Sequence, residues 1–346
     1  MSAPAPWRHE SFARAWLRRS VTIPLYVAFA ALLVLLSPFL LVMAGGTDLI
    51  RRRGFVFVRC LVLAVIFFLA ELFGMLASLV LWLRFAGWRV APSPAYLAAN
   101  FALQRRWASA IFAGARWTFG LRVVVEGDEA LRPGPVIILG RHASPLDNLI
   151  PAVIASGRHH LRLRWVINRW LLRDPCLDIV GNRLPNVFVA TGSEEPRGQS
   201  ARVSSLAAGL GPDDGVLIFP EGALFSPARL QRAIARLTAT GSEDARRAWA
   251  LRSVLPPRTG AFLSALAAVP DADVVFCEHR GLDTASDYGA LLSGELIGGE
   301  VAIRVRRFAR AAIPGDPAGQ AAWLWDRWAE LDRWARGEPT TGRGDS

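Results

Sequence analysis

Two long apolar stretches open the chain. The first, over residues 20–47, contains no charged residue and ends just before Asp48. The second, over residues 60–83, carries a single charge at Glu71. Each reaches the roughly 20 apolar residues that a helix needs to cross a bilayer. A cleaved signal peptide has a shorter apolar region, of about 7 to 15 residues. The pattern therefore predicts an N-terminal membrane-anchoring segment with two apolar helices over residues 1–84.

After residue 84 the pattern changes to short apolar runs separated by helical stretches. A helical pattern over residues 95–119 precedes seven candidate strands, at 122–126, 136–139, 163–167, 187–190, 216–219, 274–277 and 301–306. Strands that alternate with helices are typical of a parallel sheet covered by helices. We predict an α/β domain over residues 85–336, with a mainly parallel sheet, preceded by an N-terminal membrane helical hairpin.

The end of the chain carries one more helical pattern, over residues 321–336. It contains four tryptophans, Trp323, Trp325, Trp328 and Trp334. Tryptophan favours membrane interfaces, so this helix is predicted either to dock on lipid or to pack against the domain. The polar residues 337–346 are predicted to form a disordered tail.

Basic residues flank the apolar stretches on every side, so loop charge does not fix the orientation of the hairpin. A shallow hairpin with both ends and the connector on the cytoplasmic face competes with two full spans. The net charge is +11 and the sequence pI is about 11.1. The arginines are spread along the chain and no nucleic-acid motif is present, which favours an anionic lipid surface as partner and excludes nucleic acid.

A candidate base follows the second predicted strand. His142 and Asp147 lie in the segment Gly-Arg-His-Ala-Ser-Pro-Leu-Asp, with Ser144 as a predicted helix N-cap and Pro145 as the first helical residue. Asp147 would then lie in the first helical turn and reach back to the imidazole. A histidine oriented by a carboxylate can take a proton near neutral pH. The alternative is a histidine at a sheet edge beside an aspartate that only favours the helix N-terminus.

A carboxylate and a glycine follow the predicted strand over residues 216–219. The strand over residues 216–219 is followed by Pro220, Glu221 and Gly222. Open α/β sheets bind their ligands at the carboxyl ends of strands, and glycine lets backbone approach a ligand closely. Glu221 is therefore predicted to join His142 and Asp147 in one site.

With these residues the chain resembles the glycerolipid acyltransferase family, which includes the bacterial 1-acyl-glycerol-3-phosphate acyltransferases. His142 and Asp147 match the H-x-x-x-x-D pair of that family, and residues 219–222 match its F-P-E-G block. Residues 174–189 resemble the acceptor-binding block between them, and residues 254–260 resemble the fourth block. The resemblance covers residues 85–310.

Four positions depart from the family pattern. Arg141 stands where the family has asparagine, Thr191 and Leu224 stand where it has arginine, and Asn168 replaces a common lysine. Arginine is the preferred bidentate partner of phosphate, so the loss of a cation at Thr191, Leu224 and Asn168 weakens the case for a phosphate-bearing acceptor. Other arginines near the blocks are candidates to supply the charge, each with a solvated surface position as its alternative: Arg141, Arg183, Arg197 and Arg258.

The resemblance implies acyl transfer from a thioester of coenzyme A or acyl carrier protein to the hydroxyl of a lysolipid, with 1-acyl-glycerol-3-phosphate as the expected acceptor. His142 would be the base and Asp147 its orienting carboxylate. Glu221, Gly222, Arg183 and Arg258 are the predicted substrate contacts. We expect no metal and no cofactor beyond the thioester donor, and a place at the bacterial inner membrane with the catalytic domain in the cytoplasm.

Three other functions stay open at this stage. The acceptor could be a lysolipid without the usual phosphate contacts. Alternatively, the chain could bind membrane lipid without catalysis, although the intact His142, Asp147 and Glu221 argue against that. A lipid thioesterase, in which water replaces the acceptor hydroxyl, is the third.

Overall fold

The computed structural model describes residues 10–85, 87, 92–189, 196–287 and 289–338. Its centre is a seven-stranded sheet in the order β1-β7-β6-β2-β5-β3-β4. The five strands from β6 to β4 run parallel, whereas β7 runs antiparallel to β6 and parallel to β1. The strands are β1 (Arg122–Glu126), β2 (Val136–Gly140), β3 (Arg162–Asn168), β4 (Val187–Val189), β5 (Asp214–Ile218), β6 (Asp273–Arg280) and β7 (Glu300–Phe308). The predicted mainly parallel sheet and all seven predicted strands are confirmed.

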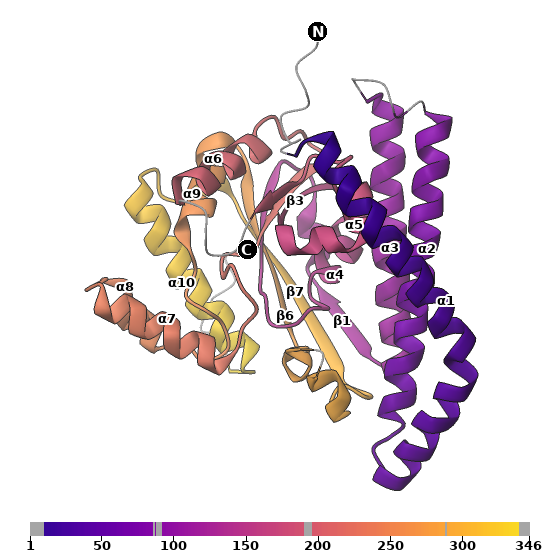
Figure 1. Cartoon of the computed structure of the whole chain (residues 1–346). Coiled ribbons are helices and arrows are strands. Elements are labelled where there is room, and N and C mark those ends of the chain that lie inside the picture. Colours follow the sequence, from indigo (N-terminus) through magenta and orange to yellow (C-terminus); the bar gives the residue numbers. More distant parts are fainter. Residues whose placement is uncertain (1–9, 86, 88–91, 190–195, 288, 339–346) are drawn as a thin grey trace.

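Helices cover both faces of the sheet (Figure 1). The central strand β2 is buried throughout, and its side chains alternate between two cores. Ile137 and Leu139 pack into the core on one face, and Val136 and Ile138 into the core on the other. The first face is covered by α6 (Pro196–Ala207), α7 (Pro227–Ala239), α8 (Asp244–Trp249), α9 (Thr259–Ala268) and α10 (Pro317–Ala335). The second is covered by α3 (Pro94–Phe119), α4 (Leu149–Pro151) and the π-helical turn η2 (Ala152–Arg158).

The N-terminal segment forms a long helical hairpin beside α3, drawn in indigo and purple in Figure 1. Its helices are α1 (Phe12–Arg51) and α2 (Val56–Arg84). In their most apolar windows only 6% and 11% of residues are buried. They are therefore not core helices of a soluble protein. Long, apolar and exposed helices of this kind indicate membrane association.

The hairpin contacts the α/β domain both near the start of α1 and at its turn. Near the start of α1, Arg18 and Arg19 both pair with Asp178, which is fully buried in α5 (Pro175–Gly181). At the hairpin turn, an ideal Cβ on Gly54 would lie 3.4 Å from Ile297, just before β7. The α/β domain therefore lies alongside the whole length of the hairpin.

Glu71 in α2 also faces the domain. Its carboxylate accepts hydrogen bonds from the indole of Trp107 in α3, at 2.8 Å, and from the N–H group of Cys176 in α5, at 3.3 Å. The single carboxyl group within the second apolar stretch thus serves helix packing, and the face of α2 that carries it does not meet lipid.

The C-terminal helix α10 packs against the domain. Trp325 and Trp328 are buried, and Trp323 stacks on Phe262. The indole of Trp328 donates to the carbonyl of Leu255 at 2.9 Å. The lipid-docking interpretation of this helix is therefore wrong, because two of its tryptophans form part of the core. Residues 339–346 of the predicted disordered tail lie outside the described residues.

Candidate active site

His142 and Asp147 lie on the segment that follows β2, at the carboxyl edge of the five parallel strands. The Nδ1 atom of His142 is 3.0 Å from the Oδ1 atom of Asp147. A carboxylate only accepts hydrogen bonds, so Nδ1 carries the proton and Nε2 of the neutral ring has a free lone pair. The side chain of His142 is 18% exposed, and that of Asp147 is fully buried. The pair is arranged as a base with its orienting carboxylate.

Backbone and side-chain donors fix the position of Asp147. The N–H groups of Ala143 and Ser144 donate to its Oδ2 atom at 2.6 and 2.8 Å, and the Nε2 atom of His279 lies 3.5 Å from the same oxygen. Burial alone would raise the pKa of Asp147, but the hydrogen bonds and charges of His142 and His279 lower it to about 2. Asp147 is therefore ionised at neutral pH.

The chain reaches this arrangement through a turn. Residues 145–148 form hydrogen-bonded turns and α4 begins only at Leu149, so the prediction that Asp147 lies in a first helical turn is wrong. The Ser144 hydroxyl donates to the carbonyl of Ala285 at 2.7 Å and accepts from the N–H group of Leu146 at 3.3 Å, within a turn rather than at the start of a helix. The long-range contact with Ala285, together with the two N–H groups that bend around Asp147, overrides the local helix-start signal.

The ring of His142 packs against Phe219, with ring centroids 4.7 Å apart. Gly140 leaves the space for that phenylalanine, since an ideal Cβ there would lie 2.7 Å from the Phe219 ring. Burial alone would lower the pKa of His142, but the hydrogen bond and charge of Asp147, together with the charge of Glu221, raise it above its ordinary value. The imidazole is therefore a somewhat stronger base than a free histidine.

Glu221 is buried behind the loop of residues 141–148, which carries His142 and is called the catalytic loop in the proposal that follows; 2% of the surface of Glu221 is exposed. Its Oε1 atom accepts from the N–H group of His142 at 2.7 Å, and its Oε2 atom accepts from the N–H group of Leu255 at 2.8 Å. Burial raises the pKa of Glu221 to about 7, although these two hydrogen bonds oppose the increase. The geometry does not fit the predicted contact with acceptor hydroxyls, because the carboxylate is buried and both of its oxygens face backbone donors. It fits a residue that holds the loop of His142.

Arg141 is fully buried, so it is neither a surface arginine nor a charge open to substrate. Its guanidinium donates to the carbonyls of His279 and Ser253, at 2.9 and 2.8 Å, and pairs with Asp283. Burial alone would raise the pKa of Asp283, but Arg141 lowers it. The departure from the family pattern at this position thus links three segments around the site.

Arg258 lies beside the turn that carries Glu221. Its N–H group donates to the carbonyl of Pro220 at 2.8 Å, and an ideal Cβ on Gly222 would lie 3.1 Å from its guanidinium. Gly222 has a φ of 65°, a conformation that favours glycine. Arg258 is exposed, and within the described residues no carboxylate lies within ion-pair distance of it. Its charge is therefore available to a ligand next to the site.

The part of the chain that forms this site matches a known protein family in sequence. Residues 122–277 match the sequence model of the Acyltransferase family, and they include His142, Asp147 and Glu221. By this match, residues 122–277 resemble an acyltransferase domain, the name used for them hereafter. Among solved structures, the chain is similar to the 1-acyl-sn-glycerophosphate (LPA) acyltransferase PlsC from Thermotoga maritima, with 12% identity and a TM-score of 0.47 over 78% of this chain and 94% of that one. None of the curated proteins matches the chain.

Arg183, a predicted substrate contact, instead contacts the hairpin helix α2 and the neighbouring helix α3. Its guanidinium donates to the carbonyl of Ser78 in α2 at 2.7 Å and lies over the ring of Tyr96 in α3. These contacts make Arg183 a link between the domain and the hairpin. Asn168 accepts from the N–H group of Trp170 at 2.9 Å and so caps a short helix. Thr191 lies outside the described residues, and so does the side chain of Arg197.

The acyltransferase domain and its neighbouring residues hold two groups that sequence reasoning missed, His279 and Arg229. His279 supports Asp147 from the end of β6, and the β2–β6 pairing that brings it there carries no local sequence signal. Arg229 lies in the first turn of α7 and donates to the carbonyl of Leu224 at 2.8 Å. Ser226 and Pro227 are a helix-start signal that predicts this position, since serine favours the N-cap and proline the first helical residue.

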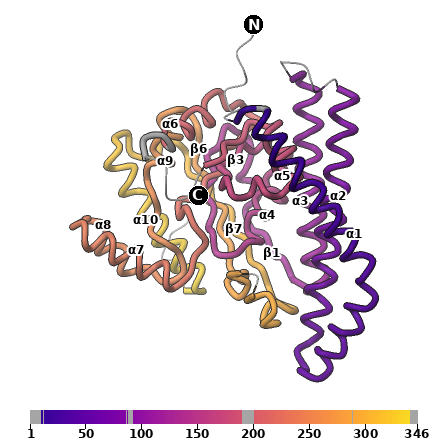
Figure 2. The backbone as a smooth tube through the Cα atoms, viewed as in Figure 1, coloured from indigo at the N-terminus to yellow at the C-terminus, as the bar shows by residue number. Residues whose placement is uncertain are grey.

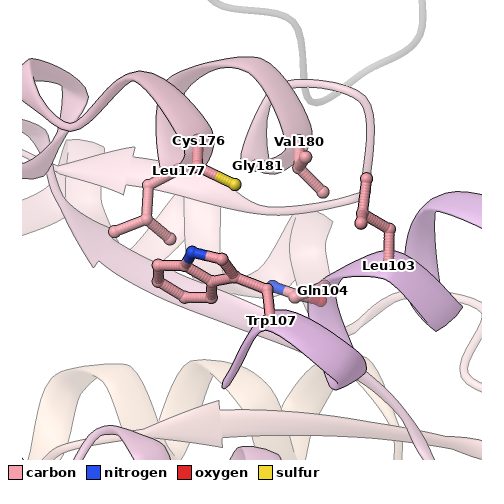
Figure 3. Close-up of a pocket in the computed structure, with 7 residues that line it drawn as sticks. All are labelled: Leu103, Gln104, Trp107, Cys176, Leu177, Val180 and Gly181. Carbon is pink, nitrogen blue, oxygen red and sulfur yellow. The ribbon is translucent and has the colours of Figure 1, made fainter. Parts of the chain in front are cut away.

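A small hollow between α3 and α5 is unrelated to this chemistry. Figure 3 shows its lining, which includes Leu103, Trp107 and Cys176. Its volume of about 10 Å³ is no larger than one water molecule requires. It cannot hold an acyl chain or a lysolipid.

Proposed function

We propose that this chain transfers a fatty acyl group from the thioester of coenzyme A or acyl carrier protein to a hydroxyl of a lysolipid. The observation that carries the proposal is the base inside the acyltransferase domain: His142 has its Nδ1 on the buried carboxylate of Asp147, and no described residue bonds its Nε2. The proposal uses the thioester as donor substrate and assigns no metal or other cofactor to the reaction.

In the proposed step, Nε2 of His142 takes the proton of the acceptor hydroxyl as its oxygen attacks the thioester carbonyl. The ester bond forms, the carbon–sulfur bond breaks, and the thiol leaves with the proton that His142 returns. A thiol has an ordinary pKa of about 8.5, so it leaves readily and the acceptor proton is the difficult one. Asp147 stabilises the imidazolium that forms between the two proton transfers.

Glu221 acts in this proposal as a positioning residue. It fixes the N–H group of His142 from behind and joins the catalytic loop to residue 255 through two backbone hydrogen bonds. A site whose base is held by a buried carboxylate keeps its geometry when substrate binds.

We propose 1-acyl-glycerol-3-phosphate as the acceptor, with Arg258 supplying the charge that Leu224 lacks. Support comes from the exposed guanidinium beside Gly222, which has no carboxylate partner among the described residues. A lysolipid without an accessible phosphate is the competing acceptor, because Leu224 and Asn168 remain neutral.

The hairpin supports a shallow position in the cytoplasmic leaflet of the inner membrane. At 1.5 Å per residue, the 40-residue helix α1 is about 60 Å long. The charged domain contacts the hairpin both near Arg18 and at its turn near Gly54. Two full spans across the bilayer would pull that domain into hydrocarbon, which its ionised surface opposes. A hairpin that lies in one leaflet keeps the domain in water.

The hairpin turn and the base lie at the same edge of the sheet. The segment between β6 and β7 connects them, because Ala285 accepts from Ser144 of the catalytic loop and Ile297 contacts the turn at Gly54. We infer that a membrane lipid reaches His142 from this hairpin side.

The proposal is tested with the purified full chain in detergent micelles, a labelled acyl thioester and a panel of lysolipids. Labelled diacyl lipid that appears only when a lysolipid is supplied supports acyl transfer, and the preferred acceptor identifies the headgroup. Arg258→Gln should raise the apparent KM for 1-acyl-glycerol-3-phosphate by about tenfold or more, since a charge-assisted hydrogen bond contributes about 1.5 to 3 kcal/mol. Release of free fatty acid without any lysolipid would identify a thioesterase, and no turnover of any kind would contradict the proposal.

A further inference from the structure

A group of arginines projects from the surface beside the active site. Residues 227–252, which include α7 and α8, contain six arginines and two acidic residues. All six arginines are exposed. Three of them lie on one side of α7, because Arg232 and Arg236 follow Arg229 by three and seven positions.

In the described part of the chain, most of these arginines lack the carboxylate partners that arginines on the sheet have; the exception is Arg247, which lies 3.9 Å from Asp326. Arg306 pairs with Glu278 and Glu330, and Arg307 pairs with Asp273. In contrast, no carboxylate of the described residues lies within 4 Å of Arg232, Arg236 or Arg246. Like charges that gather without a counter-charge repel one another and attract an anionic partner.

The arginine group begins at the catalytic turn. The peptide unit between Leu224 and Phe225 donates through its N–H to the carbonyl of His142 at 2.7 Å and accepts through its C=O from Arg229 at 2.8 Å. This single peptide unit thus links Arg229, the first arginine of α7, to the loop that carries His142. The other arginines of α7 continue away from the base along the helix.

The arginine group lies across the sheet from the membrane hairpin. Leu230 and Ile234 of α7 and Ala248 of α8 belong to the core on one face, and Cys60 and Leu63 of α2 pack on the core of the other. Figures 1 and 2 show α7 and α8 projecting from the domain on the side away from α1 and α2. A membrane that binds the hairpin on one face of the sheet does not also reach α7 and α8 on the other face. A partner of α7 and α8 is therefore a molecule from the aqueous phase.

We propose that α7 and α8 form a docking surface for an acidic carrier protein that presents the acyl thioester. This inference rests on the proposed acyl transfer and assigns its donor. Exposed arginines next to the site supply the charge complementarity, and Trp249, 61% exposed at the end of α8, supplies an aromatic anchor. The donor then approaches from the α7 side while the lipid acceptor approaches from the hairpin side.

The test compares donors on the purified full chain in neutral detergent micelles. The double variant Arg232→Glu/Arg236→Glu reverses two charges of α7. Its matched control, Arg132→Glu/Arg158→Glu, makes the same change in charge at the opposite edge of the sheet, before β2 and β3. The donors are acyl carrier protein, acyl-CoA and acyl-pantetheine, which has no charged carrier and reports whether each variant is folded and active.

We expect the α7 variant to lose at least tenfold in kcat/KM with acyl carrier protein and to stay within about twofold of the wild type with acyl-CoA and acyl-pantetheine. The wild-type rate with the carrier protein should fall as salt rises, because exposed charges are screened. The control variant should resemble the wild type with every donor.

Several results would overturn the docking surface and leave acyl transfer standing. These are a wild type that uses acyl-CoA but not the carrier protein, an α7 variant with an equal loss for both charged donors, and no loss at all. A loss seen with anionic vesicles but absent in neutral micelles would assign the arginines to lipid instead. Absence of transfer from every donor would contradict the proposed function itself.

Discussion

Replacing Asp147 by asparagine tests how the site sets the tautomer of its base. The carboxylate accepts from three groups, Nδ1 of His142 and the N–H groups of Ala143 and Ser144. The Nε2 atom of His279 lies 3.5 Å from its Oδ2 atom. An amide has one accepting oxygen and one donating nitrogen. If the amide oxygen takes the position of Oδ2, both backbone hydrogen bonds survive and the NH₂ group faces Nδ1 of His142. The proton of the ring then moves to Nε2, and the base loses its free lone pair.

In the opposite orientation, the amide oxygen accepts from Nδ1 of His142 and keeps the productive tautomer. The NH₂ group then faces the N–H groups of Ala143 and Ser144, which lose their acceptor. Each buried donor left without an acceptor costs about 1 to 3 kcal/mol, so this orientation is less stable by about 2 to 6 kcal/mol. Since about 1.4 kcal/mol corresponds to tenfold, no more than about one molecule in 30 holds the productive tautomer. Loss of the negative charge beside the imidazolium adds to this effect. We expect kcat to fall about 10² to 10⁴-fold in Asp147→Asn.

The assay is single-turnover transfer of a labelled acyl group at saturating donor and acceptor, with thermal unfolding of the variant as a folding control. The apparent KM values should change little, because Asp147 is buried and has no surface open to a substrate. A folded Asp147→Asn protein with a rate within a few-fold of the wild type would refute the tautomer argument.

Three further predictions use other contacts of the site. The pH profile of kcat/KM should have its acidic limb above the ordinary histidine pKa of about 6.5, because the raised pKa of His142 keeps the ring protonated to a higher pH; a limb at or below that value contradicts this. Glu221→Gln should lower kcat and thermal stability while leaving the acceptor KM within about twofold, since the amide loses one of two buried backbone hydrogen bonds; a selective increase in acceptor KM would restore the substrate-contact interpretation. Gly140→Ala should displace Phe219 and reduce kcat at least tenfold with the fold retained, and an unchanged rate would show that the packing of Phe219 on His142 is dispensable.

The strands and the anchor were predictable from the sequence because their signals are local. The run at 136–139 is apolar throughout and bounded by turn residues, as expected for a central parallel strand, and β2 is buried at every position. The exposed helices α1 and α2 likewise follow from apolar length alone.

The failures of sequence reasoning involve long-range contacts. Ser144 has the residue type of a helix cap, but its hydroxyl bonds Ala285, which is 141 positions away. Glu221 was predicted in the site but not facing the backbone of His142, because a sequence does not say which way a side chain points at the end of a strand. Arg141 resembles a surface cation in the sequence, and only the approach of residues 253, 279 and 283 makes it a buried link.

The most direct test of the central claim is the rate of acyl transfer in His142→Ala. The purified full-length variant should retain the wild-type unfolding temperature to within a few degrees, because the ring of His142 is a partly exposed side chain at the edge of the core. With a labelled acyl thioester and the preferred lysolipid, we predict that transfer falls to the uncatalysed background. A folded His142→Ala protein that still acylates the lysolipid at a rate near that of the wild type would contradict the assignment of His142 as the base.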